Sequence, residues 1–300
     1  MVKIKIAIVG YGNIGKGVYE AVSAAPDMEV AGVVLRDIST AKAKGVPADL
    51  KVAGHVTELG KVDVALLCIP SRSVPSTAEE LLSQGIHTVD SYDIHSDIYE
   101  LRERLSAFGK KNNSVAIIAA GWDPGTDSMI RAILEAAAPK GLTYTNFGPG
   151  MSMGHTVVAK SKPGVKNALS VTIPSGTGLH RRMVYVQPEE GVSFDDIDKG
   201  IKSDPYFSND DTHVILADDI DALQDMGHGV NMVRKGVSGT THNQLFEFCM
   251  TINNPALTAQ IMVSAARAAT RQSAGCYTLI EIPIVDMLPG NREGIIRRLV

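Results

Sequence analysis

Short apolar runs alternate with amphipathic segments over residues 3–121 of the chain. The apolar, β-branched runs predict five strands, at residues 3–10, 29–36, 62–70, 87–93 and 114–121. Segments with helical spacing of apolar residues predict helices at 13–25, 73–85 and 96–111. Continuous apolar strands that alternate with helices are typical of a parallel sheet covered on both faces. The pattern therefore predicts an α/β fold with a doubly wound parallel sheet.

The pattern changes after residue 122, where longer segments alternate between apolar and polar residues. These segments predict strands of an antiparallel or mixed sheet, at 141–148, 167–176, 181–188, 212–216 and 243–252. Residues 254–272 then form a long amphipathic pattern, which predicts a helix that packs back on the first domain. We expect one domain from residues 1–122 and 255–300, and a second, α+β domain from residues 123–254.

A G-x-G-x-x-G motif, GYGNIG, occupies residues 10–15, directly after the first predicted strand. Gly10 allows a tight turn, Gly12 lets the backbone approach a pyrophosphate, and Gly15 permits close packing of helix on strand. The N-terminus of the following helix faces the anion. In this context the motif predicts a dinucleotide site in a Rossmann-type sheet.

The end of the second predicted strand bears on which dinucleotide binds. Arg36 stands there ahead of Asp37, and a guanidinium can pair the 2′-phosphate of NADP with two hydrogen bonds. NADP is therefore favoured, although Asp37 is the ribose acceptor of NAD if the strand ends one residue later. In the next such turn, CIPSRS, Ser71 and Arg72 are either cofactor contacts or, for Arg72, a solvated loop charge.

Composition limits the classes of partner and the location. The 300 residues are 44% hydrophobic and 21% charged, enough for two domains with cores, and the net charge of −4 provides no basic field for nucleic acid or an anionic membrane. No apolar run resembles a secretory signal or a membrane span, so we expect a cytoplasmic protein. The cysteines, Cys68, Cys249 and Cys276, are widely separated, which predicts buried thiols and neither a disulfide nor a metal site.

Aspartates stand at the ends of two further predicted strands, Asp90 and Asp93 in DSYDIH and Asp123 in AGWDPG. Ligands of open parallel sheets bind at the carboxyl ends of the strands, and two close carboxylates suit an ammonium group. The chain's one tryptophan, Trp122, precedes Asp123. It is either a wall of the ligand site or a packing residue at a hinge.

Six motifs resemble, in order and spacing over the whole chain, those of the meso-diaminopimelate dehydrogenase family. They are GYGNIG, TVDSYDIH, AGWDPGTDS, TNFGPGMSMGH, MGHG and TINNPALTAQ. The resemblance implies a homodimeric, NADP-dependent oxidoreductase whose second domain binds substrate and dimerises. The implied reaction deaminates the D-centre of meso-2,6-diaminopimelate to L-2-amino-6-oxopimelate and ammonia, and its reverse is a reductive amination in lysine biosynthesis.

The resemblance also implies roles for individual residues. Asp93 and Asp123 hold the reacting amine beside Trp122, and these three are the catalytic candidates. The substrate-binding residues are Asp93, Trp122, Asp123, Phe147, Met153, Gly154, Thr172, Arg182, His228 and Asn254. The cofactor-binding residues are Gly10, Tyr11, Gly12, Asn13, Ile14, Gly15, Leu35, Arg36, Asp37, Cys68, Ile69, Pro70, Ser71, Arg72, Ser91, Tyr92, Asp93, Ala120, Gly121, Trp122, Asp123 and Pro124.

Alternatives remain for several of these residues and for the function. Phe147 also fits a core position, Thr172 an ordinary strand position and His228 a surface loop, and the sequence does not separate Arg182 from Arg181. Asp37 departs from relatives that carry a second basic residue there, so the preference for NADP over NAD is open. Two other functions are considered: another NADP-dependent enzyme, such as a different amino acid dehydrogenase or a dihydrodipicolinate reductase, and a non-catalytic NADP-sensing protein.

Overall fold

A computed structural model describes residues 3–223 and 227–300 of the chain, without the side chain of Met153. The chain divides into two compact units, Met1–Ala132 with Pro255–Val300, and Ile133–Asn254. Residues 123–132 belong to the first unit, ten residues beyond the boundary placed from the sequence. The cause is local, because the amides of Thr126 and Asp127 donate to the carbonyls of Gly121 and Trp122. These bonds tie the start of helix α4 (Thr126–Ala137) to the segment before it.

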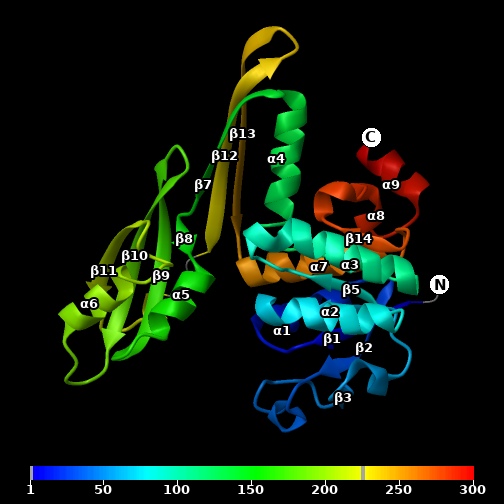
Figure 1. Ribbon diagram of the computed structural model, residues 1–300, viewed down its shortest axis with the longest axis horizontal. Coiled ribbons are helices and arrows are strands. Elements are labelled where there is room, and N and C mark those ends of the chain that lie inside the picture. The colour runs from blue at the N-terminus through cyan, green and yellow to red at the C-terminus, as the bar shows by residue number, and fades with distance from the viewer. Residues whose placement is uncertain (1–2, 224–226) are drawn as a thin grey trace. The chain divides into compact units, whose positions relative to one another are not determined.

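The first unit is built on a seven-stranded sheet with the order β14-β6-β5-β4-β1-β2-β3 (Figure 1). All neighbouring strands are parallel. The strands are β1 (Ile4–Val9), β2 (Met28–Val34), β3 (Val52–Ala53), β4 (Val64–Leu67), β5 (His87–Asp90), β6 (Val115–Ile117) and β14 (Gly275–Tyr277). The predicted Rossmann-type, doubly wound sheet is confirmed, with β3 and β14 as additional edge strands.

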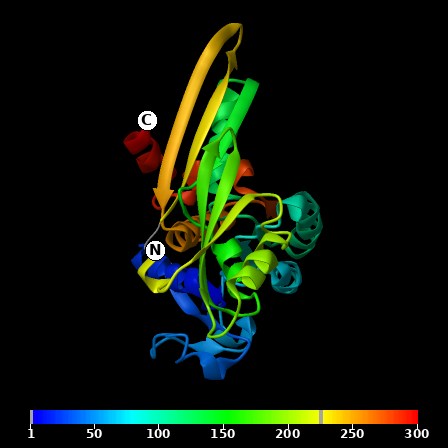
Figure 2. The same cartoon turned by 90° about the vertical axis from the view of Figure 1, so that its left-hand side faces the viewer.

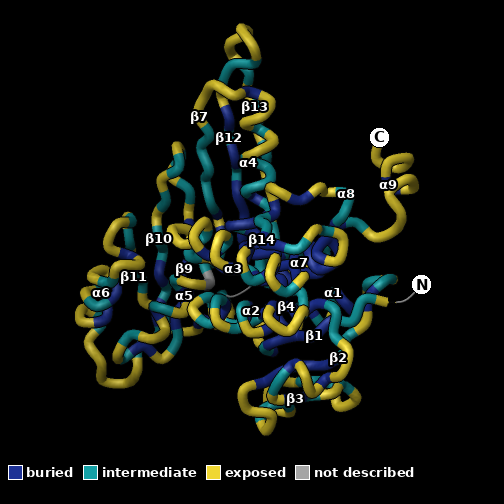
Figure 3. The backbone as a smooth tube through the Cα atoms, turned by 45° about the vertical axis from the view of Figure 1, so that its right-hand side comes forward, coloured by how far each residue is buried: buried dark blue, intermediate teal, exposed yellow. Residues whose placement is uncertain are grey.

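Helices cover both faces of this sheet, because alternate strand residues point to opposite sides. Ile6 and Ile8 of β1 pack in one buried cluster with residues of α1 (Asn13–Ala24) and α7 (Asn254–Ala269). Ala7 and Val9 pack in a second cluster with α2 (Val74–Ser83) and α3 (Ile98–Asn112). Figure 3 shows β4 as buried along its length and β1 as buried after its first two residues. The return of α7 to the first unit is as predicted.

An ion pair between the buried Arg267 and the half-buried Asp27 anchors α7 within the first unit. The Arg267 guanidinium is 4% exposed and donates to both carboxylate oxygens of Asp27, from Nε at 2.6 Å and from Nη2 at 2.7 Å. Its Nη1 donates to the carbonyl of Met287 at 2.8 Å, just before the last helix, α9 (Arg292–Leu299). The hydrogen bonds from Arg267 lower the pKa of Asp27. The pair thus joins three distant segments, the turn before β2, α7 and the end of α8 (Ile284–Met287).

The second unit contains two sheets. A mixed sheet has the order β11-β10-β9-β8, in which only β10 and β11 are parallel. A three-stranded antiparallel sheet has the order β13-β12-β7, and its long β12–β13 ribbon is conspicuous in Figure 2. The elements are β7 (Lys140–Phe147), β8 (Gly150–Met151), α5 (Met153–Lys160), β9 (Val165–Gly176), β10 (Leu179–Pro188), α6 (Phe194–Lys202), β11 (Asp211–Leu216), β12 (His228–Ser238) and β13 (Thr241–Ile252). The expected mixed α+β domain is confirmed.

The cysteines differ from the prediction in one respect. All three thiols are free, with Cys276 buried on β14 and Cys68 half-buried after β4. Cys249 is exposed, so its predicted burial was wrong. Exposed and half-buried residues alternate along β13, and Cys249 falls on the exposed side. Among residues 3–223 and 227–300, none of the helices has the length and apolar character needed to cross a bilayer.

Candidate active site

The glycine motif forms the turn between β1 and α1. A Cβ atom on Gly10, whose φ is +92°, would lie 2.4 Å from the carbonyl oxygen of Cys68. A Cβ on Gly15 would lie 2.3 Å from the carbonyl oxygen of Gly10. At Gly12 a Cβ would meet no atom within 4 Å, so the space beside this residue is open. The turn therefore leaves the N-terminus of α1 accessible to an anion, as a dinucleotide site requires.

A cavity of about 620 Å³ lies beside this turn, within the first unit. Its lining includes the predicted cofactor residues Gly10, Tyr11, Gly12, Leu35, Arg36, Asp37, Cys68, Ile69 and Pro70. Thr40, Lys44, His55 and Glu80 also line it and were not predicted from the sequence. They come from segments without a motif, so only the fold brings them to the end of β2. The cavity thus extends from the glycine turn to the end of β2, where Arg36 and Asp37 lie.

Arg36 and Asp37 are both exposed at the end of β2, but only Asp37 has a structural role there. Its Oδ1 accepts a hydrogen bond from the Ser39 amide at 3.0 Å and another from the Ser39 hydroxyl at 2.6 Å. These bonds cap a short 3₁₀ helix, Ile38–Thr40, and lower the pKa of Asp37. One carboxylate oxygen is therefore committed to the turn, which weakens the case for Asp37 as a ribose acceptor.

The aspartates at the end of β5 have different environments. Asp90 is fully buried, and its Oδ1 accepts from the amides of Tyr92 at 3.0 Å and Ala119 at 3.2 Å. Burial raises the pKa of Asp90 to about 7. Asp93 is exposed and accepts a 2.6 Å hydrogen bond from the Ser71 hydroxyl, at the end of the neighbouring strand. Asp90 therefore fastens two strand ends together, and Asp93 is the accessible carboxylate.

The segment after β6 places Trp122 and Asp123 beside the start of α4. Trp122 is buried, with 6% of its surface exposed. Asp123 Oδ1 accepts a hydrogen bond from Arg131 Nη2 at 2.9 Å. The same nitrogen lies 3.7 Å from Oδ2 of Asp127, whose side chain is completely buried. Asp127 and Arg131 were not among the predicted site residues, because no helix was predicted here; on α4 they lie one helical turn apart.

In the second unit, Arg182 and Thr172 face each other on paired strands β10 and β9. The Arg182 guanidinium donates to the Thr172 hydroxyl and, at 2.6 Å, to Asp210 Oδ2, and is 15% exposed. Arg181 instead pairs with Asp211 and is 51% exposed. Adjacent strand residues point to opposite sides, so the structure separates the two arginines, which the sequence did not.

The positive charge of Arg182 acts on three histidines, His155, His180 and His228. Burial, together with the charge of Arg182, lowers the pKa of His155 and of His228 to about 4. The same causes lower the pKa of His180, whose Nε2 accepts a hydrogen bond from the Phe147 amide at 2.8 Å. His228 is buried and accepts from the Gly229 amide at 2.9 Å, so the surface-loop alternative for it does not hold. Neutral imidazoles and one guanidinium offer donors to a carboxylate.

The connection between β7 and β8 lies against both Thr172 and His228. A Cβ on Gly148 would lie 2.3 Å from the carbonyl oxygen of Thr172, and one on Gly150 would lie 2.5 Å from Cα of His228. Phe147, Thr172 and His228 are therefore neighbours through the glycines of NFGPG. Gly154 is exposed in the first turn of α5, and Asn254 is the first residue of α7. The side chain of Met153 and the residue Met226 of the MGHG motif lie outside the described part of the chain.

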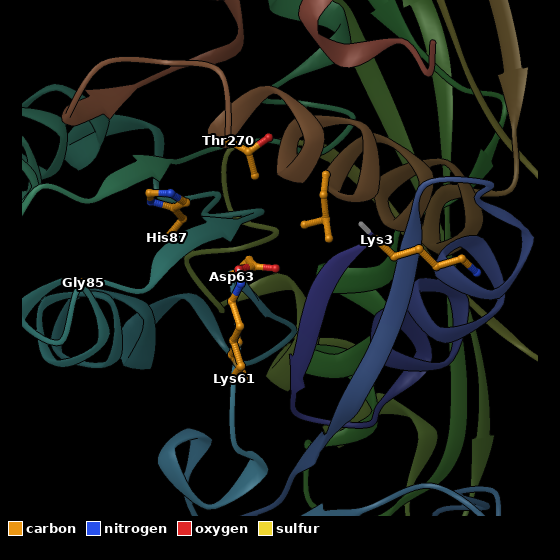
Figure 4. A pocket seen from close by; sticks show the side chains of 8 residues that line it. Lys3, Lys61, Asp63, Gly85, His87 and Thr270 are labelled. Atoms are coloured by element: carbon orange, nitrogen blue, oxygen red, sulfur yellow. Dashed lines mark ion pairs between the residues drawn. The ribbon is translucent and has the colours of Figure 1, made fainter. Parts of the chain in front are cut away.

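The remaining predicted cofactor residues do not line the cavity of the glycine turn. They are Asn13, Ile14 and Gly15 in α1, Ser71 and Arg72 after β4, Ser91 to Asp93 after β5, and Ala120 to Pro124 after β6. A second pocket, of about 360 Å³, lies at the amino ends of β1, β4 and β5 and is lined by Lys61, Asp63, His87 and Thr270 among others (Figure 4). It contains none of the predicted residues.

Comparison with known proteins identifies both parts of the chain. Residues 4–118 match the oxidoreductase family with an NAD-binding Rossmann fold, and residues 121–181 match the diaminopimelic acid dehydrogenase C-terminal domain. The chain is 59% identical to a meso-diaminopimelate D-dehydrogenase of Bacteroides fragilis, over 100% of both chains.

Two solved structures are similar over the full length of both chains. The diaminopimelate dehydrogenase of C. glutamicum, in complex with diaminopimelate, matches with a TM-score of 0.88 and 29% identity. An engineered D-amino acid dehydrogenase bound to NADP⁺ matches with a TM-score of 0.83 and 28% identity. From the 59% identity over its whole length, together with the matching C-terminal domain, this chain belongs to the meso-diaminopimelate D-dehydrogenase family.

Proposed function

We propose that this protein is an NADP-dependent meso-diaminopimelate D-dehydrogenase. It oxidatively deaminates the D-centre of meso-2,6-diaminopimelate to L-2-amino-6-oxopimelate and ammonia, and it runs in reverse as a reductive amination that serves lysine biosynthesis. The observation that carries this proposal is the 59% identity to a meso-diaminopimelate D-dehydrogenase over the whole of both chains. The same observation disfavours a dihydrodipicolinate reductase, another amino acid dehydrogenase and a non-catalytic NADP sensor.

The cofactor is NADP, which accepts a hydride from the substrate when it is bound. The described residues fit this group: the space beside Gly12 is open, and the cavity next to it is lined by Arg36 and Lys44. These two cations suit the 2′-phosphate. Lys44 supplies the second positive charge that some relatives carry at the position of Asp37. The commitment of Asp37 to the Ser39 cap supports the same preference. A cytoplasmic location belongs to this proposal, because NADP is an intracellular cofactor.

At the reacting end of the substrate, Asp93 and Asp123 hold the ammonium group. Both carboxylates follow neighbouring parallel strands, β5 and β6, at their carboxyl ends, where open sheets bind ligands. Trp122 shields the D-centre from water. The role of these residues is to orient the Cα–H bond for hydride transfer, which contributes through positioning. This assignment makes Asp93, Asp123 and Trp122 the catalytic residues.

At the other end, the second unit holds the L-centre. Arg182 binds the distal carboxylate, supported by Thr172, His228 and Asn254, and Phe147, Met153 and Gly154 complete the set of substrate-binding residues. The support for this is the buried group of one guanidinium and neutral imidazoles described above. Because only the meso isomer presents both centres correctly, the distal contacts select the stereoisomer.

The protein acts as a homodimer through the three-stranded sheet of the second unit. Leu142 of β7 and Leu245 of β13 both pair with Lys235 of β12, so the three side chains form a row on one face. Leu142 is 64% exposed and Leu245 is 58% exposed. Exposed leucines in one row on a sheet suit an interface. Sedimentation of the wild type and of Leu245→Glu tests this assignment, with a monomeric variant as the expected result.

The activity is tested by NADPH absorbance in a mixture of purified protein, NADP and meso-diaminopimelate. We expect NADPH to form with the meso isomer and not with L,L-diaminopimelate, since the latter lacks a D-centre. NAD in place of NADP is the matched cofactor control. Comparable turnover of the L,L isomer, or no turnover of the meso isomer, contradicts the proposed function.

A further inference from the structure

A buried carboxylate, Asp127, lies next to the residues assigned to the reacting amine. It stands in the first turn of α4, its side chain is 0% exposed, and its amide donates to the carbonyl of Trp122 at 3.0 Å. The indole of Trp122 also interacts with the Asp127 carboxyl group. Buried carboxylates are costly unless they are paired, and the proposed reaction leaves this one without a role.

A single guanidinium nitrogen serves two carboxylates at this point. Arg131 Nη2 lies 2.9 Å from Asp123 Oδ1 and 3.7 Å from Asp127 Oδ2. The shorter contact is a hydrogen bond, and the longer one is an ion-pair contact between residues one helical turn apart. Two carboxyl groups, of Asp123 and Asp127, therefore share one guanidinium group, that of Arg131, and all three residues belong to the first unit.

When both carboxyl groups are ionised, their two negative charges face the single positive charge of Arg131. Burial and the negative charge of Asp123 raise the pKa of Asp127 to about 7, while Arg131 and the Trp122 side chain oppose the rise. The charged side chains that act on Asp127 are Asp123 on the preceding turn and Arg131 on α4. Asp127 thus changes between its neutral and ionised forms near neutral pH.

The two forms of Asp127 leave Arg131 in different situations. When Asp127 is neutral, the charge of Arg131 acts on Asp123 without competition from Asp127, and neutralises it. When Asp127 is ionised, the guanidinium is shared, so Asp123 retains more negative charge. We propose that Asp127 is a positioning residue that sets, through Arg131, how strongly Asp123 holds the reacting ammonium group of the substrate. This inference rests on the proposed function, in which Asp123 binds that group.

The proposal predicts a specific pH profile. In the wild type, KM for meso-diaminopimelate should fall as pH rises through about 7, the range in which Asp127 ionises. In Asp127→Asn the side chain keeps its size but stays neutral, so this change of KM should vanish. At pH 8.5 the variant's KM should be roughly fivefold above that of the wild type, as expected for weakening one charge-assisted contact. KM for NADP should not change.

Asp90→Asn is the matched control. Asp90 is as deeply buried as Asp127 and its pKa is also raised to about 7, but it binds backbone amides and no guanidinium. Its variant should keep the wild-type dependence of substrate KM on pH. Thermal unfolding of each variant shows whether it is folded. If Asp127→Asn unfolds, Asp127→Leu, which fills the buried site without a charge, takes its place with the same expected profile.

The outcomes separate this inference from the function on which it rests. If the wild type does not turn over meso-diaminopimelate, or if Asp123→Asn leaves substrate KM unchanged, the proposed function or its amine site is wrong. If Asp123→Asn raises substrate KM but folded Asp127→Asn keeps the wild-type value and pH profile, the role of Asp127 alone is overturned. Loss of the pH dependence in Asp127→Asn and its retention in Asp90→Asn support the inference.

Discussion

A methyl group finds room at Gly12 but not at Gly15. We expect Gly15→Ala to lower the free energy of unfolding by about 1–3 kcal/mol, because its Cβ would lie 2.3 Å from the Gly10 carbonyl oxygen. Gly12→Ala should fold normally and lose affinity for NADPH, since the methyl group enters the space left for the pyrophosphate. Urea unfolding and a fluorescence titration with NADPH measure the two effects. Equal effects of both variants on stability contradict this division of roles.

We also expect single residues at the end of β2 and in the cavity beside it to decide cofactor choice. Arg36→Ala should weaken NADP binding by about 1.5–3 kcal/mol, the worth of a hydrogen bond to a charged group, and leave NAD binding nearly unchanged. Lys44→Ala should do the same more weakly, and Lys42→Ala is its control, because Lys44 lines the cavity and Lys42 does not. Dissociation constants for both dinucleotides check this. A parallel loss of NAD affinity in Arg36→Ala argues against a contact with the 2′-phosphate.

Among the elements, α7 depends on one ion pair for its attachment to the turn before β2. Asp27→Ala should destabilise the protein by about 3–5 kcal/mol, because it leaves the buried Arg267 guanidinium without its carboxylate. Glu29→Gln is a suitable control, since Glu29 forms an exposed pair with Lys5, at 3.8 Å, and such pairs contribute about 0–1 kcal/mol. Denaturant midpoints of the two variants should differ accordingly.

The elements also show what the sequence could predict. Long apolar runs such as β1 and β4, and the amphipathic helix α7, are specified locally, so their positions follow from pattern alone. The two-residue β3 and the three-residue β14 are too short to produce a pattern and exist only because a neighbouring strand pairs with them. β12 was missed because its buried Arg234, which donates to the Ala138 carbonyl, interrupts the apolar alternation.

The same limit applies to the candidate site. The glycine turn and the strand-end aspartates were predictable, because each is a property of a strand and the residues that follow it. His155, His180 and Lys44 were not, since their partners or cavity come from distant segments. Asp90 was grouped with Asp93 because the predicted strand ran from residue 87 to 93, and only burial separates the structural carboxyl group from the accessible one.

Over the whole molecule, four groups have strongly shifted pKa values of between about 4 and about 7. The pKa values are raised for two carboxyl groups of the first unit and lowered for two imidazoles of the second. In the first unit, Asp90 and Asp127 have pKa values raised to about 7 from an ordinary value of 3.8, so their contribution to stability is lost as pH rises through this window. In the second, His155 and His228 have pKa values lowered to about 4 from 6.5, so theirs is lost as pH falls.

Acidification from pH 7 to pH 5 should therefore weaken the second unit relative to the first. Hydrogen exchange followed by mass spectrometry, corrected for the intrinsic exchange rate at each pH, measures the two units separately. We expect protection to fall in peptides from residues 165–188 and to hold or rise in peptides from β1 and β4. A change of the same sign in both units contradicts the assignment of these four groups.

The second unit is inserted between two parts of the first, and this governs the order in which the protein can be completed during synthesis. The ribosome releases β1 to β6 early, but α7, which covers one face of their sheet, and β14, which pairs with its edge, follow residue 253. The nascent N-terminal segment thus carries an apolar face that α1 covers only in part while the whole insertion is translated. The second unit, Ile133–Asn254, is by contrast fully translated before these residues, so its folding can precede completion of the first.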